Sequence, residues 1–209
     1  MMSMRLSEAA SVLDGQMSGS DVDFMGISTD TRTLSEGALF FALQGPNFDG
    51  HAYVETARER GAAAAAVSEP CNTLLPRITV NDTRLALGRL SADWRRRLQL
   101  PVIGITGSNG KTSVRAMTSA ILARCGRTLS TQGNLNNDIG LPLTLARLNP
   151  DDRFAILEMG ANHSGDIDYL AGIARPTIAA VSYTHLTLPT TGIRCRWGGG
   201  GGGVGGGGG

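Results

Sequence analysis

A glycine-rich turn at residues 104–112, between an apolar segment and a helical pattern, most constrains the fold of this chain. Val102–Ile105 predicts a short buried strand, and the helical pattern begins at Lys111. Glycines at positions 107 and 110 let backbone N–H groups surround phosphate oxygens where a Cβ would intrude. The helix N-terminus adds a positive dipole end, Lys111 a point charge and the Thr112 hydroxyl a magnesium ligand. The segment therefore predicts a P-loop for ATP and Mg²⁺.

This loop is a variant, because Ile105 stands where the strict Walker pattern has a glycine five positions before Gly110. An ordinary glycine-rich turn is the alternative, but turn chemistry alone does not require Gly-Lys-Thr directly before a helix. The residues expected to contact the nucleotide are Gly107, Ser108, Asn109, Gly110, Lys111, Thr112 and Ser113.

Length and composition limit the class of protein. The 209 residues suit one large or two small domains, and the hydrophobic and charged fractions of 41% and 18% suit a globular protein. A net charge of +1 gives no argument for nucleic acid or a membrane surface, and no apolar run is long enough to span a membrane. The start has no signal-peptide core. Cys71, Cys125 and Cys195 lack metal-ligand spacing, so we expect reduced thiols in a cytoplasmic protein. We also expect a monomer.

The character of the sequence changes at about Ser182, and Gly198 to Gly209 are interrupted only by Val204. A flexible glycine linker is one interpretation. A non-native segment is the other, since Gly, Trp and Val codons arise from a guanine homopolymer with occasional errors. We favour the second and expect residues 182–209 to be disordered and without function.

The region before the P-loop predicts a small α/β module. The expected elements are a helix at 6–13 with Ser7 as N-cap, a strand, a polar loop and a second strand over 27–32 and 37–43, a turn-rich loop at 44–50, a helix at 52–60, and strands at 62–67 and 77–80. The segment Asn81-Asp82-Thr83 is expected to cap a helix whose apolar residues Leu87, Leu90, Trp94 and Leu98 share one face. The arginines at 95–97 are interpreted as cations facing the negative end of that helix, with nucleic-acid contact as the alternative.

The region from the P-loop onward predicts alternating strands and helices. The expected elements are a strand at 102–106, a helix at 111–124, a strand at 128–130, a helix at 142–147, a strand at 153–159, a helix ending at 174 and a strand at 178–181. Such alternation predicts a parallel, doubly wound sheet, whose ligands lie at the carboxyl ends of the strands. The fold class is therefore α/β, with an N-terminal substrate domain at 1–82, part of a P-loop domain at 83–181 and a tail at 182–209.

Few other side chains suggest chemistry. Glu158 ends its strand at the same edge as the P-loop, where a carboxylate could hold magnesium; a solvated strand-end carboxylate is the alternative. Asn134, Asn136 and Asn137 could hydrogen-bond a substrate, although loop asparagines usually form turns. Asp30, Thr31 and Arg32 follow a strand and could equally form a cap or a salt bridge. His51 and His163 lie in loops, and no Ser/His/Asp or Cys/His arrangement is predicted.

Four segments resemble the Mur ligases, the ATP-dependent amide-forming enzymes of peptidoglycan precursor synthesis. They are Ser28–Arg32 with Gly37–Leu43 and His51, the loop at 104–112, Gly133–Pro142, and Glu158-Met-Gly-Ala161. The last two resemble the members that join D-alanyl-D-alanine to UDP-N-acetylmuramoyl-tripeptide. Members that add the third amino acid typically carry Glu-x-Ser-Ser instead. The resemblance covers about residues 6–181.

The resemblance implies a reaction and a role for each candidate. It implies γ-phosphoryl transfer from ATP to the tripeptide carboxylate, followed by attack of the D-alanyl-D-alanine amine on the acyl phosphate. Lys111 and Glu158 would be catalytic, and Thr112 and Glu158 would hold Mg²⁺. The three asparagines would help place the substrate, and the residues at 30–32 would help hold the UDP-sugar end.

The sequence departs from the family pattern after Val181, where Ser-Tyr-Thr-His185-Leu186 replaces an Asn-rich strand end. His185 comes too early to match the family's magnesium-binding histidine, and the carbamylated-lysine segment and C-terminal domain are missing. We expect a truncated ligase without turnover. The alternatives are a related ligase with another substrate, a P-loop kinase or regulatory NTPase, and a UDP-sugar-binding module without catalysis.

Overall fold

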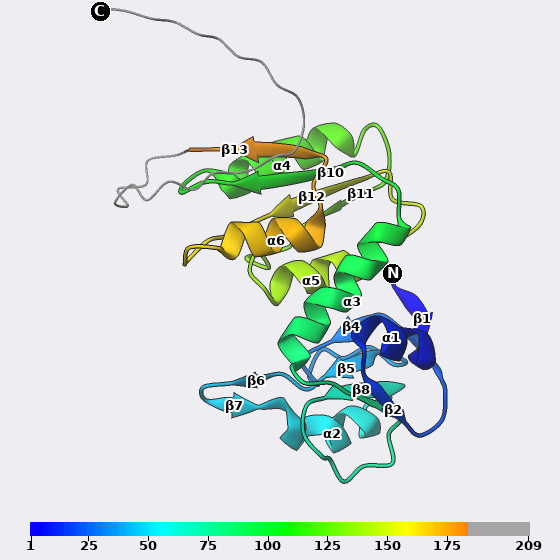
Figure 1. The fold of residues 1–209 in the computed structure, drawn as a ribbon. Coiled ribbons are helices and arrows are strands. Elements are labelled where there is room, and N and C mark those ends of the chain that lie inside the picture. Colours follow the sequence, from blue (N-terminus) through cyan, green and yellow to red (C-terminus); the bar gives the residue numbers. More distant parts are fainter. Residues whose placement is uncertain (184–209) are drawn as a thin grey trace, which may run out of the picture.

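The computed structural model describes residues 1–183 and contains two separate main sheets (Figure 1). The elements of the N-terminal part are β1 Ser3–Arg5, α1 Leu6–Leu13, β2 Gln16–Ser18, β3 Asp23–Met25, β4 Ile27–Ser28, β5 Leu39–Phe41, β6 Gln44–Gly45, β7 Phe48–Asp49, a 3₁₀ helix Gly50–Tyr53, α2 Val54–Glu59, β8 Ala64–Val67, β9 Arg77–Thr79 and α3 Thr83–Arg97. Those that follow are β10 Val102–Thr106, α4 Lys111–Leu122, β11 Thr128–Ser130, α5 Gly140–Ala146, β12 Phe154–Glu158, α6 Asp166–Ala174 and β13 Ile178–Val181.

The first sheet has the strand order β2-β9-β8-β5-β4. Strands β9, β8, β5 and β4 are parallel, and β2 joins the edge antiparallel to β9. The small side chains at 64–66 in β8 are fully buried, as expected for a central strand covered on both faces. Two antiparallel pairs, β1 with β3 and β6 with β7, lie outside this sheet.

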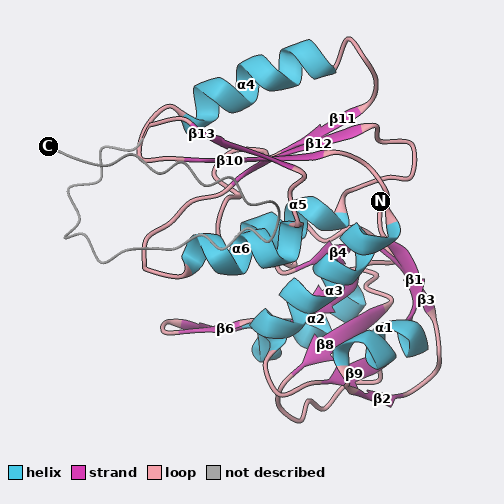
Figure 2. Ribbon diagram, turned by 45° about the horizontal axis from the view of Figure 1, so that its top comes forward, coloured by secondary structure: helices cyan, strands magenta, loops and turns pink. Residues whose placement is uncertain are grey.

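The second sheet has the order β11-β12-β10-β13, and all of its strands are parallel. Figure 2 shows α4 on one face and α5 and α6 on the other. The chain leaves β10 toward one side of the sheet and later returns to its other side with β13, so β10 is the topological switch point. The P-loop follows β10 directly, which places it where open α/β sheets bind ligands. The predicted α/β class, with a small module before a doubly wound sheet, is confirmed.

Helix α3 links the two sheets. It packs against α1 on one side and against α5 and α6 on the other, within one continuous hydrophobic core. At its first residue, the Thr83 hydroxyl donates to the Ala42 carbonyl at 2.9 Å. Near its end, Trp94 Nε1 donates to the Leu148 carbonyl at 3.1 Å. The proposed boundary at 82/83 therefore falls where a shared helix begins.

The predicted start of α3 is confirmed, with Asp82 as the capping residue of the segment 81–83, whereas Leu98, expected on the apolar face of the helix, is the extended C-cap after its last residue. Asp82 is extended, and its carboxylate accepts from the backbone N–H groups of Arg84 and Leu85 at 2.7 and 2.9 Å. At the other end, Arg95 is buried and donates to the carbonyls of Leu98 and Ala174 at 2.6 and 3.1 Å. The interpretation of this arginine as a C-terminal cation therefore holds.

Three details of the N-terminal part differ from expectation. Strands β1, β2 and β3 lie in segments for which no strand was predicted, and each is three residues long and largely exposed. The expected N-cap Ser7 is wrong: α1 begins at Leu6, and the Asp21 carboxylate accepts from the N–H and hydroxyl of Ser7, both at 2.9 Å. The expected helix at 52–60 is shorter, since its first turn is 3₁₀.

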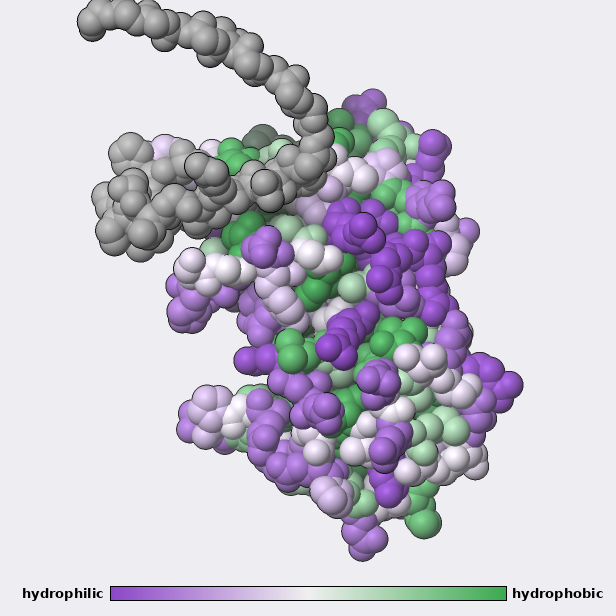
Figure 3. Space-filling model, in the orientation of Figure 1, coloured by the Kyte–Doolittle hydropathy of each residue, from purple (hydrophilic) through white to green (hydrophobic). Residues whose placement is uncertain are grey.

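Within residues 1–183, no helix is long and apolar enough to cross a membrane. The face in Figure 3 shows hydrophobic residues in small groups among hydrophilic ones. The prediction that disorder begins at Ser182 is wrong for Ser182 and Tyr183, which both contact the P-loop. The Ser182 N–H continues the sheet by donating to the Thr106 carbonyl at 2.9 Å. The rest of that prediction, including His185 and Cys195, concerns residues outside the described part.

Candidate functional site

The P-loop is formed by the expected strand, turn and helix. Gly107 and Gly110 have φ of 135° and 78°, conformations that favour glycine. Gly110 is the N-cap of α4 and supplies no side chain to cap it. The first N–H groups of the helix therefore point outward without a capping acceptor from that residue, which is the arrangement that binds phosphate.

Lys111 bends back over this loop. Its Nζ donates to the Gly107 carbonyl at 2.6 Å, so the ammonium lies above the turn instead of reaching into solvent. A cation at this position adds its charge to the helix N-terminus, and both attract the same anion.

The segment after β13 also reaches the loop, which the sequence did not predict. The Tyr183 carbonyl accepts from Ser108 N–H at 3.0 Å, and the Ser182 hydroxyl donates to the Asn109 carbonyl at 2.5 Å. A Cβ on Gly107 would lie 2.5 Å from Ser182 Oγ. The Tyr183 carbonyl oxygen thus occupies the acceptor position at the Ser108 N–H. Ser113, also predicted to contact the nucleotide, is exposed on the first turn of α4.

Glu158 is the buried carboxylate of the site. It ends β12 beside β10 and is 3% exposed. Its Oε2 accepts from the Thr112 hydroxyl at 3.2 Å and its Oε1 from Asn136 Nδ2 at 3.0 Å. Its backbone N–H donates to the Thr131 hydroxyl at 2.9 Å. The structure therefore joins the P-loop, the asparagine segment and the end of β12 through one carboxylate.

The three predicted asparagines lie in different environments. Asn136 alone among them reaches Glu158 within the described contacts. Asn137 Oδ1 accepts from Gly140 N–H at 2.8 Å and so caps the start of α5. Asn134 is exposed, and its carbonyl accepts from Asn136 N–H at 2.7 Å. A Cβ on Gly140 would lie 2.4 Å from Leu135 Cα, so this glycine lets the loop fold closely over the helix.

Arg115 is a site residue that sequence reasoning missed. Its Nε lies 3.3 Å from Glu158 Oε2, and its side chain is 17% exposed. A signal was present, because position 115 follows Lys111 by four residues and Thr112 by three, which places it on the same side of the helix.

The donor set fits a magnesium nucleotide. Hydroxyl, carboxylate and amide oxygens are hard ligands, and Mg²⁺ usually takes one or two protein ligands together with substrate phosphates. Thr112 and Glu158 already lie within hydrogen-bond distance of each other. Within residues 1–183, no cluster of three or more His, Cys, Asp or Glu could form an all-protein metal cage.

The residues predicted to hold the UDP end lie on the other sheet. Asp30, Thr31 and Arg32 follow β4, and no described contact joins them to the P-loop. Arg32 donates to Asp30 through Nε and Nη2, at 3.0 and 2.7 Å. These bonds from the Arg32 side chain lower the pKa of Asp30 to about 2. Thr31 is buried, and its carbonyl accepts from Arg60 at 2.9 Å.

A Ser/His/Asp grouping, which the sequence did not predict, lies in the N-terminal part of the chain. His51 Nδ1 is 2.6 Å from Asp49 Oδ1, and His51 Nε2 is 3.3 Å from the Ser68 hydroxyl. The backbone N–H of His51, followed by its ring, lowers the pKa of Asp49. However, the Ser68 backbone N–H donates to Nε2 at 2.9 Å, so the ring lone pair is already used. The grouping ties β8 to the turn at 49–51 and is not a nucleophile–base pair.

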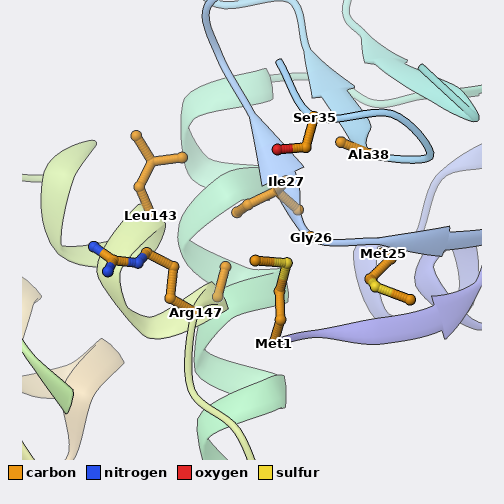
Figure 4. A pocket seen from close by; sticks show the side chains of 9 residues that line it. Met1, Met25, Gly26, Ile27, Ser35, Ala38, Leu143 and Arg147 are labelled. Carbon is orange, nitrogen blue, oxygen red and sulfur yellow. The ribbon is translucent and has the colours of Figure 1, made fainter. Parts of the chain in front are cut away.

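A small cavity of about 50 Å³ lies between the two parts of the molecule (Figure 4). Its lining residues are Met1, Met25, Gly26, Ile27, Ser35, Ala38, Leu143, Ala146 and Arg147. None of these is a predicted site residue, and the volume is well below that of a typical cofactor pocket.

Comparison with known proteins agrees with the fold. A sequence model described as "Mur ligase family, catalytic domain" matches residues 23–95, and "Mur ligase middle domain" matches residues 105–186. The UDP-N-acetylmuramoyl-tripeptide–D-alanyl-D-alanine ligase of Escherichia coli is 47% identical over 182 residues, which are 87% of this chain and 40% of that protein.

Solved structures give the same result. A crystal structure of MurF from Acinetobacter baumannii matches with a TM-score of 0.82 and 37% identity, over 87% of this chain and 41% of that one. MurF from Thermotoga maritima in complex with ADP matches with a TM-score of 0.67 and 29% identity, over 73% of this chain and 36% of that one. The chain thus spans about 40% of the length of the E. coli relative.

Two adjoining family matches, a shared fold and a P-loop on the switch-point strand all agree. This chain belongs to the Mur ligase family.

Proposed function

We propose that this chain supplies the nucleotide-binding and UDP-precursor-binding parts of a ligase that joins D-alanyl-D-alanine to UDP-N-acetylmuramoyl-tripeptide. The observation that carries the proposal is the convergence of Thr112, Asn136 and Arg115 on the buried Glu158 beside the P-loop. An ADP complex of the Thermotoga maritima relative supports nucleotide binding by this fold.

In the proposed reaction, the ATP γ-phosphoryl passes to the terminal carboxylate of the tripeptide, and the dipeptide amine then displaces phosphate from the acyl phosphate. Lys111 and the first N–H groups of α4 would bind the β- and γ-phosphates. Thr112 and Glu158 would hold Mg²⁺, which neutralises charge on the transferring oxygens. Ser108 would exchange the Tyr183 carbonyl for a phosphate oxygen.

Nucleotide binding is tested with Lys111→Ala. Loss of the ammonium should weaken binding of Mg·ATP by roughly tenfold or more, measured by isothermal titration calorimetry. Arg124→Ala is the matched control, because it also removes one cation from the same region but lies exposed beyond the end of α4. Equal affinities for Lys111→Ala and the unmutated chain would refute P-loop binding.

Precursor binding is proposed for the loop after β4, with Asp30, Thr31 and Arg32 as contacts. The Arg32 side chain is 82% exposed, so its guanidinium is accessible to a diphosphate while it stays oriented by Asp30. Titration with the tripeptide and dipeptide forms of the UDP precursor tests the substrate. The proposed ligase should bind the tripeptide form more tightly, whereas a ligase that adds the third amino acid would bind the dipeptide form more tightly. Arg32→Ala should weaken binding of both forms.

The domain division at 82/83 and the monomeric state are part of the same proposal. Whether the 209-residue chain itself makes amide product stays a prediction: we expect none. Product formed from the tripeptide precursor, ATP and D-alanyl-D-alanine would contradict it.

A further inference from the structure

Arg115 is anchored independently of Glu158. Its Nη1 donates to the Thr131 carbonyl at 2.5 Å and to the Ser130 hydroxyl at 3.2 Å. The Ser119 hydroxyl, one turn further along α4, donates to the same Ser130 oxygen at 2.9 Å. The guanidinium is therefore fixed between α4 and the end of β11, whatever the carboxylate does.

The contact between Arg115 and Glu158 is an ion pair without a directed hydrogen bond. Nε lies 3.3 Å from Oε2, yet this buried nitrogen has no aligned acceptor. A charge pair without a directed bond compensates the charge of the carboxylate, whose two oxygens accept instead from Thr112 and Asn136.

Charge balance makes this pair important. Thr112 and Asn136 are neutral, and the Lys111 ammonium donates to the Gly107 carbonyl. Among the ion pairs of residues 1–183, Arg115 provides the cation for Glu158. A buried carboxylate without a counter-charge is strongly unfavourable, so this pair accounts for how Glu158 stays buried before any metal arrives.

We propose that Arg115 is an internal counter-ion that occupies the electrostatic place of a divalent cation at Glu158. The inference rests on the proposed role of Glu158 as a metal ligand. A metal ion that arrives alone meets a neutralised carboxylate and a nearby guanidinium, so it binds weakly. A metal ion that arrives with ATP brings phosphate oxygens, whose negative charge offsets the guanidinium. Arg115 thus makes the affinity of Glu158 for a metal ion depend on whether the nucleotide is bound. It acts through Glu158 and does not contact the reacting atoms.

The test is Mn²⁺ binding to the full chain without nucleotide, measured by electron paramagnetic resonance. Arg115→Gln should bind Mn²⁺ about tenfold more tightly than the unmutated chain, because a positive charge near the metal is removed. Arg115→Lys keeps the charge and should show a smaller gain. Arg115→Gln combined with Glu158→Gln should lose the gain, because the ligand is gone.

Three results would overturn the inference: Arg115→Gln binding no more tightly than the unmutated chain, an equal gain in Arg115→Lys, or a gain that survives Glu158→Gln. If Arg115→Gln is too unstable to titrate, melting temperatures decide. The double variant should melt above Arg115→Gln, and a double variant that melts no higher overturns the counter-ion.

The assay contains no ATP, so its result is independent of nucleotide binding. Tighter Mn²⁺ binding by Arg115→Gln together with no ATP binding by the unmutated chain would refute the proposed function alone. Normal ATP binding without tighter Mn²⁺ binding would refute this inference alone.

Discussion

Just after β11 ends, the side-chain hydroxyl of Thr131 takes the place of a backbone carbonyl as acceptor for the Glu158 N–H. Removing this hydroxyl tests how much the bond stabilises the end of β12. Thr131 is 1% exposed, and its Oγ accepts from the Glu158 N–H at 2.9 Å. Thr131→Val keeps the shape of the side chain but leaves this buried N–H without its acceptor. An unsatisfied buried donor costs about 1–3 kcal/mol, so we expect the free energy of unfolding to fall by that amount.

Thr144→Val is the matched control. Thr144 is also fully buried, but its hydroxyl donates to the Gly140 carbonyl, which lies one helical turn earlier and also accepts in the α5 ladder. Removing that hydroxyl leaves no backbone group unpaired, so the loss should stay below about 1 kcal/mol. Urea unfolding followed by far-UV circular dichroism measures both. A loss in Thr131→Val no larger than in Thr144→Val would refute the reasoning.

Two further outcomes follow from the same structure. Gly140→Ala places a Cβ 2.4 Å from Leu135 Cα and should lower the melting temperature. Gly172→Ala, in α6 with open space around it, should instead stabilise the protein by about 0.5–1 kcal/mol. Equal melting temperatures for the two variants would contradict the close approach at Gly140. Because the pKa of Asp30 is lowered to about 2, its contribution to stability is present above about pH 4 and is lost as the pH falls through 2. Arg32→Gln should return the Asp30 pKa toward its ordinary value in a carboxyl NMR titration, and an unchanged pKa would rule out Arg32 as the cause.

The parts of the fold that the sequence predicted are those with strong local patterns. The strand–turn–helix at the P-loop, the Asp82 cap of α3 and the parallel strand ending at Glu158 each depend on a few adjacent residues. The edge strand β2 of the first sheet was missed because it has only three residues, all of them exposed, so no alternation of buried and exposed positions marks it.

The contacts of the site were harder to predict, because they depend on which loops meet. Asn136 and Asn137 were given the same predicted role, yet Asn136 reaches Glu158 and Asn137 caps α5. Arg115 reaches Glu158 only because α4 packs against β11 and β12. A pattern within one segment of the sequence cannot predict the contact between Arg115 and Glu158, because the two residues lie on different elements.

Helix α3 also has a consequence for protein engineering. Its 15 residues, about 22 Å long, contact α1 through one side and α5 and α6 through the other. Arg97 near its end pairs with Glu8 of α1, while Arg95 donates to the Ala174 carbonyl at the end of α6. A chimera that exchanges the N-terminal sheet at 82/83 would therefore leave the incoming α1 against a helix from the other parent. Exchanging α1 together with the facing residues of α3 is the division most compatible with this packing.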